Sequence, residues 1–441
     1  MEEQFKKGFF EFIAAADAEK VHSQTIGWIF SNDCDVFDYK EKSTILNELL
    51  FNFENNDIDL IPNKVDVEIH NIDILITCGD KLVVIENKIK SSQHSNQLFK
   101  YEYLTANNKQ MAWECYLQWK FPDEYMKIRA KNDESSFLNE IQELQVNELY
   151  AKDFKCDSDI QGKKPFYIYL TLIDEEPQGT KEKWIKVSYS RLHEVLSKYL
   201  KNKEHQVSES FWVLKSYLST IRKLSSATIS FINNPKDFEF VFKEGKKSEI
   251  GFHEHNAASG YIKICKMQTS LQKWFYSKLI EDVKSINLEL FKTIEYSIGE
   301  THGTALLDFT FKEITLNGKE CVPMLQFQGS SIKLALVGSS KTETKETLIK
   351  KDIVDKRKRD FAERLSKSSE FTELVKIKDV SNVSEKIPEK NSKISTPKNA
   401  NGFISINLNK KNKYWQLEDN PQNYIIDMIK TAFTIFQQIK D

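Results

Sequence analysis

Three charged residues in the first quarter of the chain could act together on a phosphodiester. Asp73 lies in one apolar run, and the triplet Glu86-Asn87-Lys88 ends a second apolar run. Alternate residues of a strand point to the same face, so Glu86 and Lys88 share a face. If Asp73 lies on the neighbouring strand of a hairpin, two carboxylates and an ammonium converge. This combination suits hydrolysis of an anionic phosphodiester, which needs a cation and a polarised water.

Carboxylates in such a position recruit Mg²⁺ or Mn²⁺. Asp73, Glu86 and the main-chain carbonyl of Asn87 would give hard oxygen ligands and leave positions open for water and the scissile phosphate. Lys88 would orient or deprotonate that water, or stabilise charge on the transition state, and the sequence leaves both roles open. The alternative is a salt-bridged surface hairpin. Charges deep in an apolar strand are costly unless they are paired or bound to a metal, which disfavours that alternative.

The periodicity of apolar residues predicts the elements that must position these groups. Alternation predicts two strands, a tight turn and a buried third strand at 65–69, 72–77, 78–81 and 82–89. Ser91 or Ser92 then caps a helix that carries Gln97 and Tyr101. These two residues are four apart and share a helical face, from which they can overlook the site. Taken alone, the pair fits an ordinary polar helix surface equally well.

Two helices are expected before the strands. The first reaches Asn32 and holds Glu19 and His22, and the second, from about Ser43 to Phe53, holds Glu48. After the site, strands at 166–172 and 184–187 and helices at 191–200 and 209–224 complete an α/β unit. Beyond residue 228 we expect a helix at 258–283, strands at 293–298, 305–311, 323–328, 332–337 and 403–408, and a final helix at 424–439.

Several motifs together resemble a known family. The residues Asp73, Glu86-Asn87-Lys88 and Gln97-x-x-x-Tyr101 resemble the PD-(D/E)XK nuclease superfamily, including the Gln-x-x-x-Tyr element of its exonuclease-like branch. Glu19-Lys-Val-His22-Ser23 resembles the opening Glu-x-x-His-Ser segment of an uncharacterised bacterial group in that superfamily, and the segments 167–171 and 184–189 resemble its later strands. The likeness covers roughly residues 10 to 225. Ile72 stands where the motif has Pro, a familiar departure.

The resemblance implies both a fold and roles for residues. It implies a restriction-endonuclease-like α/β core, with a mixed central sheet flanked by helices, in residues 1–227. The helices and strands expected beyond it predict a C-terminal α+β domain in 228–441. Asp73 and Glu86 would be metal ligands, Lys88 catalytic, and Gln97 and Tyr101 would touch the substrate or position the metal site. A Glu on the helix before the sheet reaches the metal in many members. The candidates are Glu19, Glu48 and Glu68, with Glu19 and Glu48 preferred.

Two interpretations of His22 are open. It could lie near the phosphate, or it could be a structural histidine that caps its helix. The basic segment at 341–400, with 16 Lys and Arg against 11 Asp and Glu, is expected to be a mobile part of the C-terminal domain.

Composition limits the compartment and the partners. The chain has 63 Lys and Arg against 65 Asp and Glu, so any nucleic-acid surface must be local. Six scattered cysteines without a CxxC pair favour reduced thiols, and the acidic start and the absence of long apolar runs disfavour export and membrane insertion. We therefore expect a cytoplasmic nuclease.

The resemblance also suggests partners. DNA is the expected substrate and RNA the second choice, with a role in bacterial antiviral defence by analogy alone. A homodimer or a regulatory protein partner is compatible with the sequence. The alternative is a catalytically silent nuclease fold that only binds nucleic acid or a partner.

Overall fold

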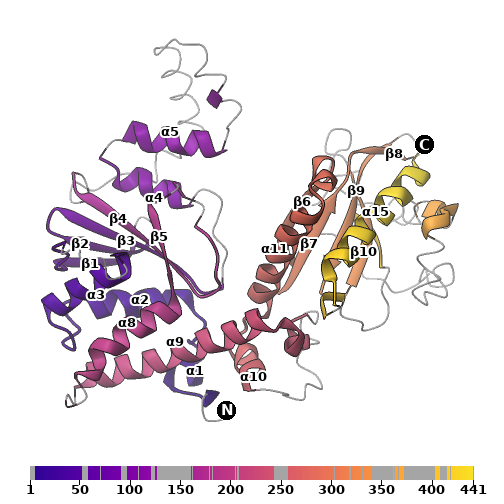
Figure 1. Ribbon diagram of the computed structural model, residues 1–441. Helices are drawn as coiled ribbons and strands as arrows, with labels where there is room; N and C mark the ends of the chain where they lie inside the picture. Colours follow the sequence, from indigo (N-terminus) through magenta and orange to yellow (C-terminus); the bar gives the residue numbers. More distant parts are fainter. Residues whose placement is uncertain are drawn as a thin grey trace, which may run out of the picture. The chain divides into compact units, whose positions relative to one another are not determined.

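The computed structural model of the chain forms two compact units (Figure 1). It describes residues 5–51, 58–69, 71–90, 97–107, 109–120, 125–126, 160–242, 257–338, 361–371, 403–407 and 415–440, apart from isolated positions within these ranges. Unit 1 comprises Met1–Ser230 and Asn256–Met267, and unit 2 comprises Phe231–His255 and Gln268–Asp441. None of the described helices is long and apolar enough to cross a bilayer.

Unit 1 is built on a mixed five-stranded sheet in the order β1-β2-β3-β4-β5. Its strands are β1 (Lys64–Ile69), β2 (Ile72–Cys78), β3 (Lys81–Lys88), β4 (Lys164–Thr171) and β5 (Trp184–Ser188). The first three strands are antiparallel, whereas β3, β4 and β5 run parallel. The five strands predicted from periodicity are thus confirmed, with their ends within one or two residues. Of the eight residues of β3, seven are buried, as a central strand covered on both faces requires.

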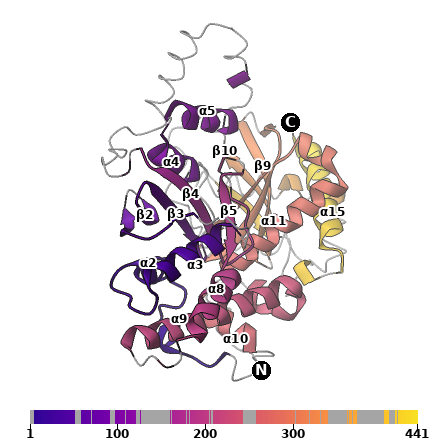
Figure 2. The same ribbon diagram turned by 60° about the vertical axis from the view of Figure 1, so that its left-hand side comes forward.

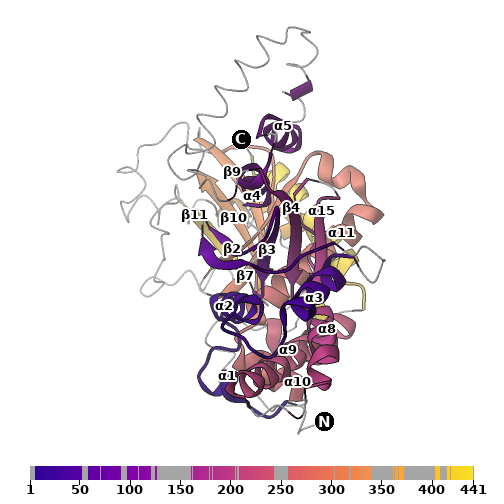
Figure 3. The ribbon, with the colours of Figure 1, turned by 90° about the vertical axis from the view of Figure 1, so that its left-hand side faces the viewer.

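Helices lie on both faces of this sheet. The helices that begin in unit 1 are α1 (Phe9–Phe12), α2 (Glu19–Phe30), α3 (Tyr39–Phe51), α4 (Gln97–Thr105), α5 (Lys109–Lys120), α8 (Tyr189–Lys201), α9 (Glu209–Asn233) and α10 (Ala257–Ile264). Leu98, Tyr101 and Leu104 of α4 pack on Leu75 and Val84 of the sheet, on what we call the α4 face. The opposite face, which we call the α2 face, carries α2, α3 and α8 (Figures 2 and 3).

Three helices differ from their predicted bounds for local reasons. The expected opening helix is divided into α1 and α2, and Ala14 between them has φ 57°, which no helix continues through. Helix α3 begins at Tyr39 rather than Ser43 because Asp38 and Glu41 accept each other's main-chain N–H groups in a capping box. The cap expected at Ser91 or Ser92 lies outside the described residues.

The helix expected at 258–283 is two helices, α10 and α11 (Gln268–Ile286), separated at Lys266 with φ 49°. Helix α10 belongs to unit 1, where its Tyr261 hydroxyl donates to Oε1 of buried Glu11 over 2.5 Å. The same carboxylate pairs with Lys223 at 2.5 Å. Burial would raise the pKa of Glu11, but its hydrogen bonds to Lys223 and Tyr261 outweigh burial and lower it. A segment from beyond residue 255 therefore completes the core of unit 1.

Unit 2 is an α+β unit on a six-stranded antiparallel sheet, ordered β11-β10-β9-β7-β6 with β8 paired to β9. Its strands are β6 (Glu295–Thr301), β7 (Thr304–Thr310), β8 (Ile314–Leu316), β9 (Lys319–Gln328), β10 (Ser331–Gly338) and β11 (Phe403–Asn407). Helices α11 and α15 (Pro421–Ile439) supply the apolar residues that pack with this sheet. The mixed sheet of unit 1 and this second sheet confirm the predicted fold class. Of the basic segment at 341–400, the structure describes only positions between 361 and 371.

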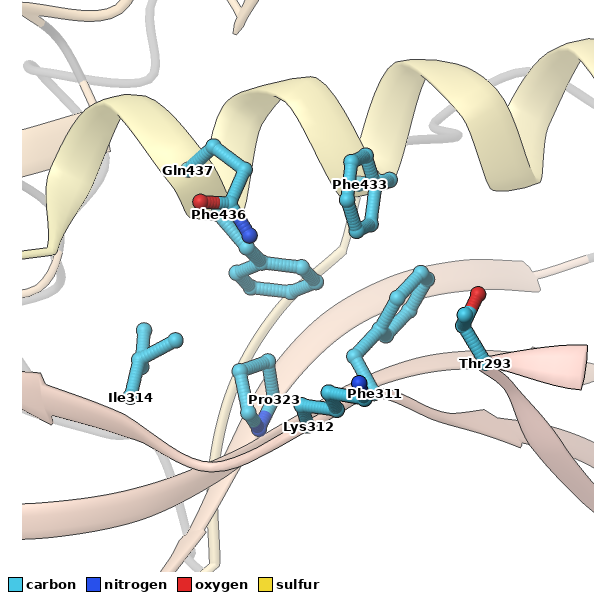
Figure 4. Close-up of a pocket in the computed structure, with 8 residues that line it drawn as sticks. All are labelled: Thr293, Phe311, Lys312, Ile314, Pro323, Phe433, Phe436 and Gln437. Carbon is cyan, nitrogen blue, oxygen red and sulfur yellow. The ribbon is translucent and has the colours of Figure 1, made fainter.

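A small pocket of about 140 Å³ lies in unit 2 between α15 and the strands (Figure 4). Phe433, Phe436 and Gln437 of α15 border it on one side, and Phe311, Lys312 and Pro323 border it on the other. Three aromatic rings contribute to its wall, and those of Phe311 and Phe436 are 5.3 Å apart between centroids. None of the residues proposed from the sequence for the chemical site lines this pocket.

Packing of α2 on the sheet depends on Gly27. A Cβ at this position would collide with Cγ2 of Val67 on β1. Gly27→Ala should therefore destabilise unit 1 by about 1–3 kcal/mol through overpacking, although Ala is favoured over Gly in helices. Urea unfolding followed by circular dichroism checks this. The second change Val67→Ala should restore part of the loss, and a stabilised Gly27→Ala protein would contradict the close approach.

Candidate active site

The antiparallel register of β2 and β3 brings Asp73 and Glu86 to the same end of the hairpin. Ile74 pairs with Ile85, so the next pair outward is Asp73 with Glu86. The N–H of Asn87 donates to Oδ2 of Asp73 over 2.7 Å, which fixes the Asp73 carboxylate beside the end of β3. Directly opposed residues of an antiparallel pair share a face, so both carboxylates lie on the α4 face.

Lys88, Gln97 and Tyr101 form a chain of hydrogen bonds that starts at this pair of carboxylates. Lys88 Nζ pairs with Glu86 and donates to Oε1 of Gln97 over 3.3 Å. Gln97 Nε2 donates to the Tyr101 hydroxyl over 2.7 Å, and that hydroxyl donates to the carbonyl of Asn71 in the β1–β2 turn. The structure thus brings together the Gln and Tyr of the Gln-x-x-x-Tyr element, and it aims Gln97 at Lys88.

Burial sets the electrostatics of the two carboxylates. Desolvation raises the pKa of Asp73 to about 6, against the lowering effects of the Asn87 N–H and Lys88. Desolvation and then the neighbouring Asp73 raise the pKa of Glu86 to about 8. Burial would lower the pKa of Lys88, but attraction by Glu86 and Asp73 outweighs burial and raises it. The site is therefore short of positive charge when both carboxylates ionise.

Glu86 has the chemistry of a cation ligand. Its side chain is 0% exposed, and burial raises its pKa even though Lys88 pairs with its Oε1. Ionising a carboxylate buried in this way costs free energy unless a cation compensates. In the described residues no three His, Cys, Asp or Glu side chains form a closed metal cage. Asp73 and Glu86 therefore fit an open site that would also use main-chain oxygen and water.

Glu19 and Glu68 lie near this centre. Glu19 Oε1 accepts the N–H groups of Ile89 and Lys90, each over 2.9 Å, at the point where β3 ends. Its charge contributes to raising the pKa of both Asp73 and Lys88, after larger contributions. Glu68 continues the β1–β2 register opposite Asp73, has φ 58° and is exposed. Of the three acidic candidates, Glu19 is thus the one bound to the end of β3.

Glu48 and His22 are placed away from the two carboxylates. Helix α3 packs on the α2 face, where Glu48 accepts from Lys198 over 2.6 Å and from Tyr199 over 2.5 Å, both on α8. His22 is buried, and its Nε2 lies 2.9 Å from the carbonyl of Ala16, which only accepts, so Nε2 carries the proton. Nδ1 then accepts from Tyr217 over 3.2 Å. This pattern is that of a structural histidine, and we leave Glu48 out of the proposed site.

Two tyrosines near the centre were not singled out from the sequence. Tyr169 of β4 pairs with Glu86 in the parallel register and donates to Oε2 of Glu175 over 3.1 Å. Tyr189, the first residue of α8, is 0% exposed and donates to Oδ1 of Asn87 over 2.6 Å. Their one sequence signal was that both lie in the segments that resemble later strands of the family. A partner 102 residues away leaves no local pattern.

The buried state of His22 predicts a pH dependence of stability. Burial lowers its pKa to about 4, below its ordinary value of 6.5, so the unfolded chain binds more protons between these pH values. Stability from neutral His22 is complete above about pH 6.5 and is lost as pH falls towards 4, by up to about 3 kcal/mol. Urea unfolding between pH 7 and 4 checks this. The free energy of unfolding should fall more steeply with falling pH in wild type than in His22→Gln. Exposed His205→Gln is the control, and identical slopes for wild type and His22→Gln would refute it.

Comparison with known proteins agrees with the geometry of this site. Residues 7–219 match the model of the PD-(D/E)XK nuclease superfamily. No curated protein and no solved structure matches the chain. The matched segment contains all five strands of the mixed sheet and the Asp73, Glu86 and Lys88 cluster, and a match to this superfamily suggests nuclease activity. Over residues 7–219, just under half of its length, the chain is similar to the PD-(D/E)XK nuclease superfamily.

Proposed function

We propose that this protein is a divalent-metal-dependent nuclease that hydrolyses phosphodiester bonds of DNA. The observation that carries the proposal is the Glu86 carboxylate, which is fully buried, pairs with Lys88 and lies opposite the carboxylate of Asp73. A purely structural protein would gain stability by replacing such a group, so its presence favours a function that needs the charge. Mg²⁺ or Mn²⁺ is the expected cation, since both prefer carboxylate oxygens.

Asp73, Glu86 and the main-chain carbonyl of Asn87 would hold this cation. The N–H of Asn87 points towards Asp73, and the N–H and C=O of one strand residue point to the same side. The Asn87 carbonyl is thus directed to the side on which Asp73 lies. A bound divalent cation supplies charge neutralisation at the phosphate and a polarised water.

The raised pKa of Lys88 supports one of its two possible roles. An ammonium with a raised pKa stays protonated at neutral pH, so it donates hydrogen bonds rather than taking a proton from water. Gln97 holds Nζ at 3.3 Å and limits where it can point. Lys88 is therefore proposed to stabilise negative charge on the phosphate in the transition state.

The substrate and the biological role extend this proposal. DNA is proposed over RNA, and antiviral defence in a bacterial cytoplasm is proposed as the setting, both on the family resemblance alone. The rival is a catalytically silent nuclease fold that only binds nucleic acid. Wild-type protein that neither binds the metal nor cleaves nucleic acid would favour this rival. Glu19, held at the end of β3, is the proposed acidic residue from the helix before the sheet.

Removing the ammonium should abolish cleavage. Lys88→Ala is expected to reduce the rate by about 10²–10⁴-fold, the range for loss of a positioned catalytic group. Linear, circular and single-stranded DNA and RNA, each with Mg²⁺, Mn²⁺ or EDTA, provide the assay. Lys81→Ala, which changes a lysine at the other end of β3 that pairs with Asp80 at 2.7 Å, is the matched control. Equal rates for Lys88→Ala and wild type would refute the assignment.

Removing the buried charge should stabilise the metal-free protein. The pKa of Glu86 is raised to about 8, so protonation favours the folded state, and stability is lost as pH rises from about 4.5 through 8. Glu86→Gln should therefore raise the free energy of unfolding at pH 7 by up to about 3 kcal/mol without metal. Thermal melts with and without Mn²⁺ check this.

Mn²⁺ should stabilise the wild type more at higher pH, and it should leave Glu86→Gln unchanged. Glu48→Gln changes a buried carboxylate with partners on α8 and should keep the Mn²⁺ effect. If Mn²⁺ stabilises Glu86→Gln as much as wild type, Glu86 does not bind the cation.

A further inference from the structure

The middle residue of the Glu86-Asn87-Lys88 triplet faces away from the two charged residues. Strand alternation directs the Asn87 side chain to the α2 face, where it is 1% exposed. Its Nδ2 donates to Oγ of Ser23 over 3.0 Å and to the carbonyl of Glu19 over 3.2 Å. Its Oδ1 accepts from the Tyr189 hydroxyl over 2.6 Å. Both ends of the amide are thus bound to elements outside the sheet.

The partners of Asn87 are themselves fixed. The Tyr189 ring packs edge-on against His22 with centroids 5.5 Å apart, and His22 is held by Ala16 and Tyr217. Ser23 Oγ also donates to the carbonyl of Glu19 over 3.1 Å. The side chains of Asn87, Tyr189, His22, Ser23 and Tyr217 are buried, and Glu19 is half-buried, so the buried members have few alternative positions and little water to replace a lost partner. The network explains why Glu19, His22 and Ser23 occur together in α2.

The network acts on the site through the main chain of Asn87. The peptide N–H of this residue holds the Asp73 carboxylate at 2.7 Å, and its neighbours on either side are Glu86 and Lys88. A rotation of the Asn87 peptide would therefore move all three groups. Reacting groups must keep their geometry to within a fraction of an ångström, because a displacement of about 1 Å can cost about 10²-fold in rate.

We propose that Tyr189 is a positioning residue of the nuclease site, which acts from the α2 face by locking the orientation of Asn87. Ser23 supports it from α2. This inference rests on the proposed function, because it concerns the same cation and the same reaction. Tyr189 touches neither substrate nor cation, and its contribution passes through the Asn87 peptide to Asp73.

Loss of the Tyr189 hydroxyl should weaken the site more than it weakens the fold. Tyr189→Phe keeps the ring against His22 but leaves Oδ1 of Asn87 buried without its donor. Residues that orient metal ligands from behind typically contribute 10–100-fold to metal affinity or activity. We expect Mn²⁺ affinity or kcat to fall by about that factor, with KM for DNA changed less than about twofold.

The control is another buried tyrosine whose hydroxyl is hydrogen-bonded. Tyr167 is 5% exposed, and its hydroxyl lies 2.8 Å from Thr105 Oγ1, at a position that faces α4 and not Asn87. Tyr167→Phe should therefore have a similar structural cost without the functional one. Mn²⁺ binding is measured by electron paramagnetic resonance on the full chain without nucleic acid, kcat and KM by DNA cleavage, and stability by thermal melts.

The outcomes separate this inference from the proposed function. Loss of Mn²⁺ affinity in Tyr189→Phe but not in Tyr167→Phe, at matched stability, supports the positioning role. Equal affinities and kcat values in the two variants overturn it. If Tyr189→Phe does not fold, Ser23→Ala removes an acceptor of the same amide and is expected to give a smaller loss of the same kind. Wild-type protein that binds Mn²⁺ without cleaving overturns only the nuclease function, whereas wild type that binds no Mn²⁺ overturns both.

Discussion

The desolvation of the Glu86 carboxylate is the constraint on which the rest of unit 1 depends. A carboxylate that is 0% exposed would ordinarily be removed from a protein core. Here the surroundings hold it in place without neutralising it. Lys88 offers one ion pair, Asp73 adds a second negative group, and the covering helix α4 keeps water away. A bound cation would offset the free energy that burying this carboxylate costs.

The two faces of strand β3 carry residues with different proposed roles. In β3 the outer members of Glu86-Asn87-Lys88 face α4 and the proposed metal site, and the middle member faces α2 and α8, which hold its side chain. The period of two in a strand makes this division automatic, because no loop is needed to separate the groups. The central place of β3 in the sheet lets neighbours on both faces restrain the same three peptides. Such restraint is harder to obtain on an edge strand or a loop.

Local patterns predicted the sheet and the charged cluster but not the supporting contacts. The hairpin of β2 and β3 was predictable because alternation and a Gly-containing turn lie within twenty residues. The break at Lys266 left no pattern, since its neighbours are apolar at helical spacing. The sequence could not decide whether His22 is a site residue or a structural histidine, because its hydrogen-bond partner Tyr217 is 195 residues away. It favoured Glu48 as readily as Glu19, because the lysine that holds Glu48 lies 150 residues later.

The return of α10 to unit 1 has a consequence for biosynthesis. The ribosome makes residues 7–219, which carry the whole matched nuclease segment, well before Tyr261 emerges. Until then the Glu11 carboxylate lacks the hydroxyl that it accepts from in the finished protein. The core around residues 7–219 is thus incomplete while residues 231–255, which belong to unit 2, are being made. The core of unit 1 is therefore completed only when residues 256–267 have been made, after residues 231–255 of unit 2.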